Sequence, residues 1–316
     1  MRHARRPGGL PRGGRAAARL VRLGGVRKRA DAQPGPQRDA QRLVRATSVR
    51  PQLKLGDPVS LPLSVNIELL FREAGDDPGD RVRAAADHGF DVVEIWSHSD
   101  KDLDHLEKAL ASTGSTLHTM LIEGRLTLAD AKTHEGFLAH VREAVAVANR
   151  LGCTRIVTGS GVGLPYLKRA VQHGIVVEAL KAGAEIAAAR GVTIVLENLN
   201  TKVDHPGTLF DTTAECLAAV REVGSPGLAL LYDAYHSLQM GETPAREVAG
   251  AMDLVSHVQI ADLPDRTEPG TGTVDWAARL RELRELGYAG PFGLEYVPTT
   301  DSMTSLRAIG EIAAGL

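Results

Sequence analysis

From residue 61 onward, short runs of apolar and β-branched residues alternate with longer segments in which apolar residues recur every three or four positions. The short runs predict strands at residues 64–67, 91–95, 116–119, 155–158, 193–197, 228–232, 256–260 and 292–296. The longer period predicts amphipathic helices between them, for example over residues 136–151, 176–190 and 274–286. Glycines suited to ending helices, such as Gly114 and Gly152, stand shortly before several strands.

This alternation predicts an α/β protein. Eight strands, each followed by a helix, within about 255 residues are typical of a (β/α)8 TIM barrel. A doubly wound open sheet is the alternative, because alternation alone does not distinguish an open sheet from a closed barrel. We therefore expect residues 61–316 to form a single TIM-barrel domain.

The first 58 residues have a different composition. They contain thirteen Arg and two Lys against three Asp and no Glu, a net charge of +12, together with many Gly and Pro. Without a sustained apolar segment they do not fit a secretory signal. We expect a disordered extension, which a translation start assigned too early would explain. An organellar transit peptide and a basic arm for nucleic acid or membrane are the alternatives.

The remainder of the chain is acidic, with 22 basic and 36 acidic residues and a net charge of -14. Such a body repels a phosphate backbone, so we expect no nucleic-acid partner. Cys153 and Cys216 are far apart and form no CxxC pair, which fits a reducing cytoplasm and excludes a thiolate zinc site. No apolar run is long enough to span a bilayer, so we expect no membrane partner. The sequence leaves a homo-oligomer open.

Oxygen-bearing side chains end four successive predicted strands. The functional groups of a parallel barrel collect at the carboxyl ends of its strands, where side chains alternate between inside and outside. Carboxylates gathered there repel one another unless a cation neutralises them. Such a set suits Mg2+ or Mn2+ better than Zn2+. The sequence thus predicts a divalent-metal site. For any single residue, a structural ion pair is the alternative. The four candidate metal ligands are Glu197, Asp233, Gln259 and Glu295.

The segments around these residues carry a second signal. They read LYDAYH at 231–236, SHVQIADLPDRTEPGTG at 256–272, EYVP at 295–298, and ENLN at 197–200 followed by HPG at 205–207. Together they resemble the hydroxypyruvate isomerase family within the xylose-isomerase-like TIM barrels. That superfamily also contains ketose 3-epimerases, inosose dehydratases and endonuclease IV. The resemblance is close over about residues 190–298 and looser back to Asn66.

The resemblance implies that Glu197, Asp233, Gln259 and Glu295 bind the metal and that Glu197 and Glu295 also form the acid/base pair. It places His236 and Arg266 where substrate oxygens are held. Gln at position 259, where ketose epimerases have His, favours the hydroxypyruvate isomerase branch. The chain departs from the family at His118–Glu123, where a short loop replaces Asn-Leu-Pro and a long insertion, and at Asn198, where Pro is usual.

We therefore expect an enzyme that isomerises a small α-hydroxy carbonyl compound, of the hydroxypyruvate to tartronate semialdehyde type, through a metal-stabilised enediolate. Its substrate would be a small sugar or a hydroxy-keto acid. A ketose 3-epimerase, an inosose or dehydroshikimate-type dehydratase, and a non-enzymatic sugar-binding or regulatory barrel are the alternatives. An endonuclease IV-like repair enzyme is disfavoured, because it needs more histidines and a cationic groove.

Several further side chains could contact the substrate. Arg266 offers a planar fork to a carboxylate, although a surface pairing with Asp265 or Glu268 is the alternative. His118, Asn66 and Glu94 end the third, first and second predicted strands, at the expected mouth of the barrel. We also expect His257 to be a buried histidine that could orient a metal ligand, and Trp96 to line the pocket wall.

Overall fold

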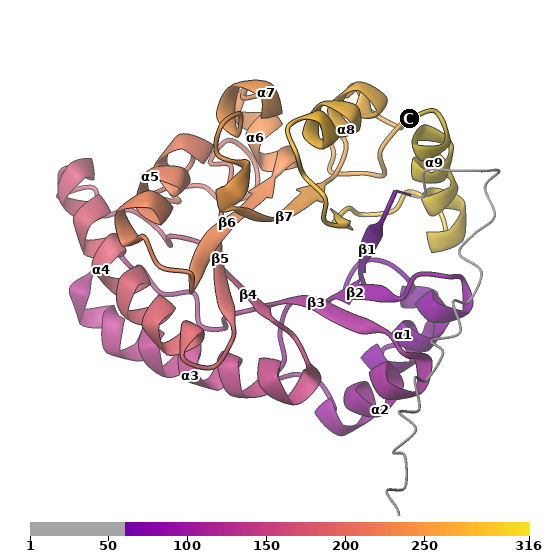
Figure 1. Ribbon diagram of the computed structural model, residues 1–316, viewed down its shortest axis with the longest axis horizontal. Coiled ribbons are helices and arrows are strands. Elements are labelled where there is room, and N and C mark those ends of the chain that lie inside the picture. The colour runs from indigo at the N-terminus through magenta and orange to yellow at the C-terminus, as the bar shows by residue number, and fades with distance from the viewer. Residues whose placement is uncertain (1–60) are drawn as a thin grey trace, which may run out of the picture. The chain divides into compact units, whose positions relative to one another are not determined.

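The computed structural model describes residues 61–316, in which eight parallel strands form one closed barrel (Figure 1). Each strand pairs with the next along the chain, and β8 pairs back with β1, so that Ser64 lies opposite Gly293. This closure confirms the TIM barrel and excludes the open sheet. The strands are β1 (Leu63–Asn66), β2 (Val92–Glu94), β3 (Thr116–Leu121), β4 (Arg155–Thr158), β5 (Thr193–Glu197), β6 (Leu228–Asp233), β7 (Val255–Ile260) and β8 (Phe292–Leu294).

Helices surround the barrel, with at least one after each strand (Figure 1). They are α1 (Pro78–Asp87), α2 (Leu103–Thr113), α3 (His134–Leu151), α4 (Arg169–Ala188), α5 (Thr213–Val223), α6 (Ala234–Met240), α7 (Pro244–Glu247), α8 (Trp276–Glu285) and α9 (Ser302–Ala314). Short 3-10 turns lie at Arg72–Ala74, Ala131–Thr133 and Met252–Leu254. Among residues 61–316, no helix combines the length and the apolar character needed to cross a membrane.

The predicted elements are confirmed, and their ends differ for local reasons. Helix α4 begins at Arg169, seven residues before the predicted residue 176. The Gln172 side chain anchors the turn that precedes the helix, because it accepts the N–H of Leu164 and donates to the carbonyls of Leu164 and Leu167. Strand β8 ends at Leu294 and not at residue 296, since the next link to β7, from Glu295 N to Ile260 O, lengthens to 3.4 Å. Glu295 therefore stands just beyond its strand. The expectation for residues 1–58 lies outside the described residues.

The main hydrophobic core lies between the strands and the surrounding helices, where Trp276, Tyr232 and Phe292 are fully buried. Inside the barrel the two halves differ. Val157, Val195 and Leu231, from β4, β5 and β6, form a small separate apolar cluster. On the other side, buried polar side chains from β1, β2, β3 and β7 fill the interior, namely Ser64, Glu94, Thr119 and His257. One half of the interior is thus built for polar contacts.

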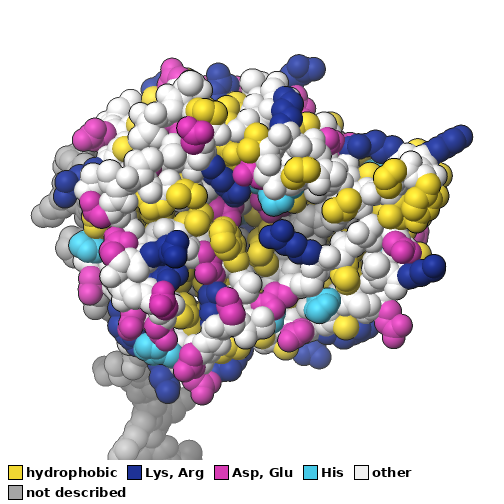
Figure 2. All heavy atoms as spheres, turned by 180° about the vertical axis from the view of Figure 1, so that it is seen from behind, with side chains coloured by type: hydrophobic (Ala, Val, Ile, Leu, Met, Phe, Trp, Pro, Cys, Tyr) yellow, Lys and Arg dark blue, Asp and Glu magenta, His cyan; other side chains and the backbone are white. Residues whose placement is uncertain are grey.

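The outer surface carries charges of both signs. On the face shown in Figure 2, acidic and basic side chains are interspersed with hydrophobic ones, and no continuous basic band crosses the described part of that face.

Candidate active site

Glu197 and Asp233 meet at the mouth of the barrel. They end the neighbouring strands β5 and β6, and together with His236 they offer ligand atoms that all lie within 4.8 Å of one another. Asp233 also caps helix α6, because its Oδ1 accepts the backbone N–H of His236 at 3.0 Å. That bond fixes the carboxylate and leaves Oδ2 free, 3.6 Å from His236 Nε2. The two carboxylates of this grouping are able to hold a metal ion.

Asn198 clamps the backbone of Asp233. Its Oδ1 accepts the Asp233 N–H at 3.0 Å, and its Nδ2 donates to the Asp233 carbonyl at 3.0 Å. The side chain therefore continues the pairing of β5 with β6 past Glu197, where the strand ends. Proline, the usual residue of the family at this position, offers neither side-chain group. Asn198, the residue that departs from the family pattern, thus holds the backbone of Asp233, in addition to the bond between Asp233 Oδ1 and the His236 N–H.

Glu295 lies at the mouth within reach of three hydrogen-bond donors from other elements. Trp96 Nε1 donates to its Oε1 at 2.5 Å, and Asn66 Nδ2 is 3.3 Å from the same oxygen. An Arg266 Nη atom lies 3.1 Å from Oε2. Asn66 thus reaches the mouth as predicted and contacts Glu295. Trp96 lines this part of the site, and its bond to Glu295 was not predicted.

The buried carboxylates are electrostatically strained. Burial raises the pKa of Glu197 well above its usual value, and nearby Glu295 and Asp233 raise it further. Burial raises the pKa of Asp233 to about 7, although Arg266 opposes the shift. Burial also raises the pKa of Glu295, against the opposing effects of Arg266 and Trp96. Three acids in one small space thus resist becoming three anions unless a cation joins them.

Arg266 faces the site from the loop after β7. Its guanidinium pairs with Glu295 and lies 3.8 Å from Asp204 Oδ1, and it stacks 5.3 Å above the Tyr235 ring. The alternative pairing with Asp265 or Glu268 is not observed; Glu268 instead accepts the backbone N–H and the hydroxyl of Thr299. Only one-fifth of the Arg266 side chain is exposed.

Hydrogen bonds to the Asp262 side chain stabilise the loop that carries Arg266. The buried carboxylate of Asp262 accepts backbone N–H groups from Leu263, Gly270, Gly272 and Val274. A Cβ at Gly272 would lie 1.9 Å from the Leu263 carbonyl, so this position admits only glycine. Arg266 itself has φ +56°, a left-handed conformation that a non-glycine residue adopts at some cost. The loop thus fixes the direction of Arg266, which explains why the segment 256–272 is so distinctive.

His236 is held in one tautomer by Asn200. Asn200 Oδ1 accepts the N–H groups of Val203 and Asp204, so its Nδ2 faces His236 Nδ1 at 2.6 Å. Nδ1 must then accept, and the ring proton sits on Nε2. Burial lowers the pKa of His236 well below its usual value, which keeps the ring neutral. His236 therefore presents an N–H donor to the site, 3.6 Å from Glu197 Oε1, and does not act as a metal ligand through that atom.

Gln259 lies above a polar network inside the barrel. Its Nε2 donates to Glu94 Oε2 at 2.9 Å, whereas its buried Oε1 has no partner. Glu94 also accepts from His257, so it is fully occupied beneath the mouth and does not extend into it as a substrate contact. His257 is buried, as expected.

His118 packs edge-on against His257, with ring centroids 4.6 Å apart. A bulge between β2 and β3 explains how both His118 and the adjacent Thr119 reach the interior: Val93 pairs with Leu117, but Glu94 pairs with Thr119. Burial lowers the pKa of His118 to about 3, with His257 adding to the shift, and its Nε2 has no partner. Its proposed contact with substrate stays a prediction.

The chemistry of these groups fits a divalent cation. Gln259 offers a buried carbonyl oxygen without a hydrogen-bond partner, and the carboxylates of Glu197, Asp233 and Glu295 have raised pKa values that a positive charge would lower. All the available ligand atoms are oxygens, which hard cations such as Mg2+ and Mn2+ prefer.

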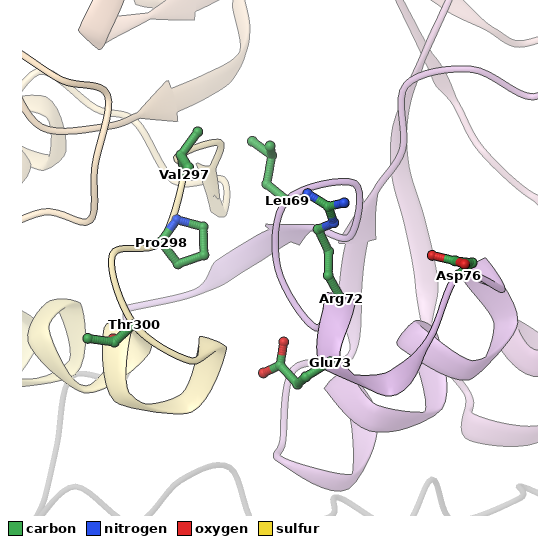
Figure 3. Close-up of a pocket in the computed structure, with 7 residues that line it drawn as sticks. All are labelled: Leu69, Arg72, Glu73, Asp76, Val297, Pro298 and Thr300. Atoms are coloured by element: carbon green, nitrogen blue, oxygen red, sulfur yellow. The ribbon is translucent and has the colours of Figure 1, made fainter.

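A shallow groove lies beside the site, between the loop after β1 and the segment after β8 (Figure 3). It is lined by Leu69, Arg72, Glu73, Asp76, Val297, Pro298 and Thr300. Val297 and Pro298 lie two and three residues after Glu295, so the groove borders the mouth. Neither Glu197 nor Glu295 lines this groove.

The roles of Asn198, Asn200 and Asp204 were not predicted. Asp204 accepts from Asn200 Nδ2 and from the Tyr235 hydroxyl and lies near Arg266, so it links the loop after β5 to helix α6 and to the loop after β7. A weak signal existed in the sequence: Asn198 and Asn200 lie in the segment ENLN that begins with Glu197, and Asp204 directly precedes the segment HPG. Which groups they contact depends on the neighbouring loops and could not be inferred from spacing.

Comparisons with known proteins agree with this geometry. Residues 82–312 match the family described as xylose isomerase-like TIM barrel. The hydroxypyruvate isomerase of Escherichia coli (strain K12) is 29% identical over 263 residues, covering 78% of this chain and 97% of that protein. The 2-oxo-tetronate isomerase of Cupriavidus necator is 30% identical over 238 residues, covering 72% and 90%. Among solved structures, an AP endonuclease, family 2, from Brucella melitensis superimposes with a TM-score of 0.73 at 27% identity, covering 79% and 99%.

Proposed function

The chain belongs to the xylose isomerase-like TIM-barrel family, and from that premise we propose that it is a divalent-metal-dependent isomerase of small α-hydroxy carbonyl acids. The reaction resembles that of hydroxypyruvate isomerase: a hydrogen moves between neighbouring carbons, so that a hydroxy ketone and a hydroxy aldehyde interconvert. Curated relatives named for hydroxypyruvate and 2-oxo-tetronate support this class of substrate, since both are small hydroxy-keto acids.

The observation that carries the proposal is the pair of buried glutamates at one mouth. Glu197 and Glu295 both have raised pKa values, which suits groups that must take up and release a proton near neutral pH. One of them accepts the proton from the hydroxyl-bearing carbon. The other donates a proton to the former carbonyl carbon, while the proton of the substrate hydroxyl passes to the former carbonyl oxygen. A module that only binds sugar has no need of two such acids.

Other residues of the chain hold the substrate during this transfer. His236 presents its Nε2 proton to a substrate oxygen, since Asn200 fixes that tautomer. Arg266 offers guanidinium donors to a carboxylate, in a direction fixed by the loop around Asp262. A cation held by Glu197, Asp233, Gln259 and Glu295 would polarise the substrate carbonyl and offset the negative charge that develops on its oxygens.

Proton exchange in D2O, followed by NMR, tests the proposal. Protein treated with EDTA would be given hydroxypyruvate, a 2-oxo-tetronate and a small panel of ketoses, with and without Mn2+. We expect deuterium incorporation next to the carbonyl only when Mn2+ is present, and an aldehyde product from hydroxypyruvate. Exchange with inversion at one carbon would instead indicate an epimerase, and loss of water a dehydratase. No exchange with any substrate, despite bound Mn2+, would contradict the proposal.

Glu197→Gln provides the matched test of the acid/base pair, because it keeps an oxygen ligand and removes the titrating group. Its turnover should fall by roughly 100-fold or more, a magnitude typical of lost general acid/base catalysis. Full turnover in this variant would rule out the mechanism with two glutamates.

A further inference from the structure

Glu94 occupies the centre of the polar half of the barrel and is completely buried. Its Oε1 accepts from Ser64 Oγ at 2.5 Å and is 2.9 Å from His257 Nε2. Its Oε2 accepts from Thr119 Oγ1 and from Gln259 Nε2, both at 2.9 Å. Both oxygens are therefore fully used as acceptors, and the side chain has no free atom to offer a substrate.

The neighbours of Glu94 are groups that donate hydrogen bonds. Ser64 and Thr119 present hydroxyl groups, His257 presents a ring nitrogen, and Gln259 presents its amide nitrogen. A carboxylate has acceptors only. Of the two ends of the Gln259 amide, Glu94 can therefore hold only the NH2 end.

This selectivity decides what Gln259 presents to the mouth. In the opposite orientation, the Gln259 carbonyl oxygen would stand about 2.9 Å from Glu94 Oε2, with two acceptors facing each other and no hydrogen between them. In the observed orientation the amide nitrogen is satisfied and Oε1 is buried without a partner. A buried polar atom without a partner calls for a ligand.

The missing side chain of a glycine leaves room for this arrangement. Gly293 lies opposite Gln259 in the pairing of β7 with β8. A Cβ there would be 2.5 Å from Glu94 Oε1, 2.7 Å from His257 Nε2 and 2.8 Å from Gln259 Cγ. The glycine lets three polar side chains from β2 and β7 meet in the barrel interior.

We propose that Glu94 is a positioning residue that fixes the Gln259 amide with its carbonyl oxygen toward the cation site. Glu94 touches neither substrate nor cation; it acts through Gln259. It thereby completes an all-oxygen ligand set for a hard divalent cation. The inference rests on the proposed function in so far as that function needs the cation.

Titration of Mn2+ into the metal-free protein, followed by calorimetry, is the first test. Glu94→Leu removes the acceptor, so Mn2+ affinity should fall by roughly 10- to 100-fold, as is typical when a partner of a metal ligand is lost. Thr119→Val is the matched control, because it removes another donor to Glu94 Oε2 and leaves Gln259 in place. Its affinity should stay within about threefold of wild type. Equal affinities for Glu94→Leu and wild type would overturn the inference.

A second test measures the wild-type protein without metal and uses a variant only to assign one NMR signal. The side-chain NH2 of Gln259, assigned by the NMR signal that disappears in Gln259→Met, should exchange with solvent far more slowly than exposed glutamine side chains. Rapid exchange would overturn the inference. If the wild type binds no Mn2+ but the Gln259 NH2 is protected, the orientation by Glu94 stands and the metal-dependent part of the proposed function fails.

Discussion

Removal of the Asn198 side chain should uncouple Asp233 from strand β5. In Asn198→Ala the Asp233 N–H loses its acceptor in a buried position, which costs about 1–3 kcal/mol. The bond to the Asp233 carbonyl is also lost, at about 0.5–1.5 kcal/mol. We expect a loss of about 2–4 kcal/mol in the free energy of unfolding. In a domain of this size, that corresponds to a fall in Tm of roughly 5–15 °C.

The same change should weaken metal binding, because Asp233 is no longer held in place from both sides. We expect Mn2+ affinity to fall by roughly 10- to 100-fold. Denaturant unfolding of the metal-free protein and calorimetric titration measure the two effects. Thr193→Ala is the control: Thr193 Oγ1 also bonds a backbone carbonyl, that of Pro226, but at the opposite end of β5. If Asn198→Ala were as stable as this control and bound Mn2+ equally well, the clamp would have no role.

Three further predictions concern pH, Arg266 and Gly293. Because burial raises the pKa of Asp233 from 3.8 to about 7, the metal-free protein should lose stability as pH rises from about 4 to 7. For the same reason Mn2+ should bind more tightly at pH 8 than at pH 6, with a proton release that calorimetry in two buffers measures. Binding of Mn2+ that does not depend on pH would contradict this prediction. Arg266→Lys should lower kcat/KM by roughly 10- to 100-fold for acid substrates, because the planar fork is lost, and much less for an uncharged ketose; an equal loss for both would argue against carboxylate recognition. Gly293→Ala should cost about 1–3 kcal/mol of stability through overpacking against Glu94 and His257, and an unchanged denaturation midpoint would contradict the crowding seen at this glycine.

Much of the barrel could be predicted from the sequence, because each element is specified locally. Each predicted strand overlaps an observed strand, and each helix predicted by range overlaps an observed helix. Gly114 and Gly152 end helices with φ of 74° and 71°, as their positions suggested. Even the convergence of Glu197 and Asp233 followed from strand ends alone, since parallel strands deliver their carboxyl ends to one face.

The contacts within the site could not be predicted in the same way. The bond from Trp96 to Glu295 joins residues 199 positions apart, and the network under Gln259 depends on a bulge at His118 that no local pattern indicates. Glu94 ends its strand like the metal-binding candidates, yet the barrel directs it beneath the mouth. Strand position predicts which side chains enter the barrel but not the depth at which each one lies.

The residues that support the site differ in chemistry from those that form it. The acids at the mouth titrate with raised pKa values, whereas the amides beside them, Asn198, Asn200 and the proposed ligand Gln259, do not titrate. An amide can fix a neighbour through both a donor and an acceptor without adding charge to a crowded site. Two of these amides, Asn198 and Asn200, hold Asp233 and His236 whether or not the acids are protonated. The response of this site to pH should therefore follow its carboxylates, while the positions of its ligands stay the same.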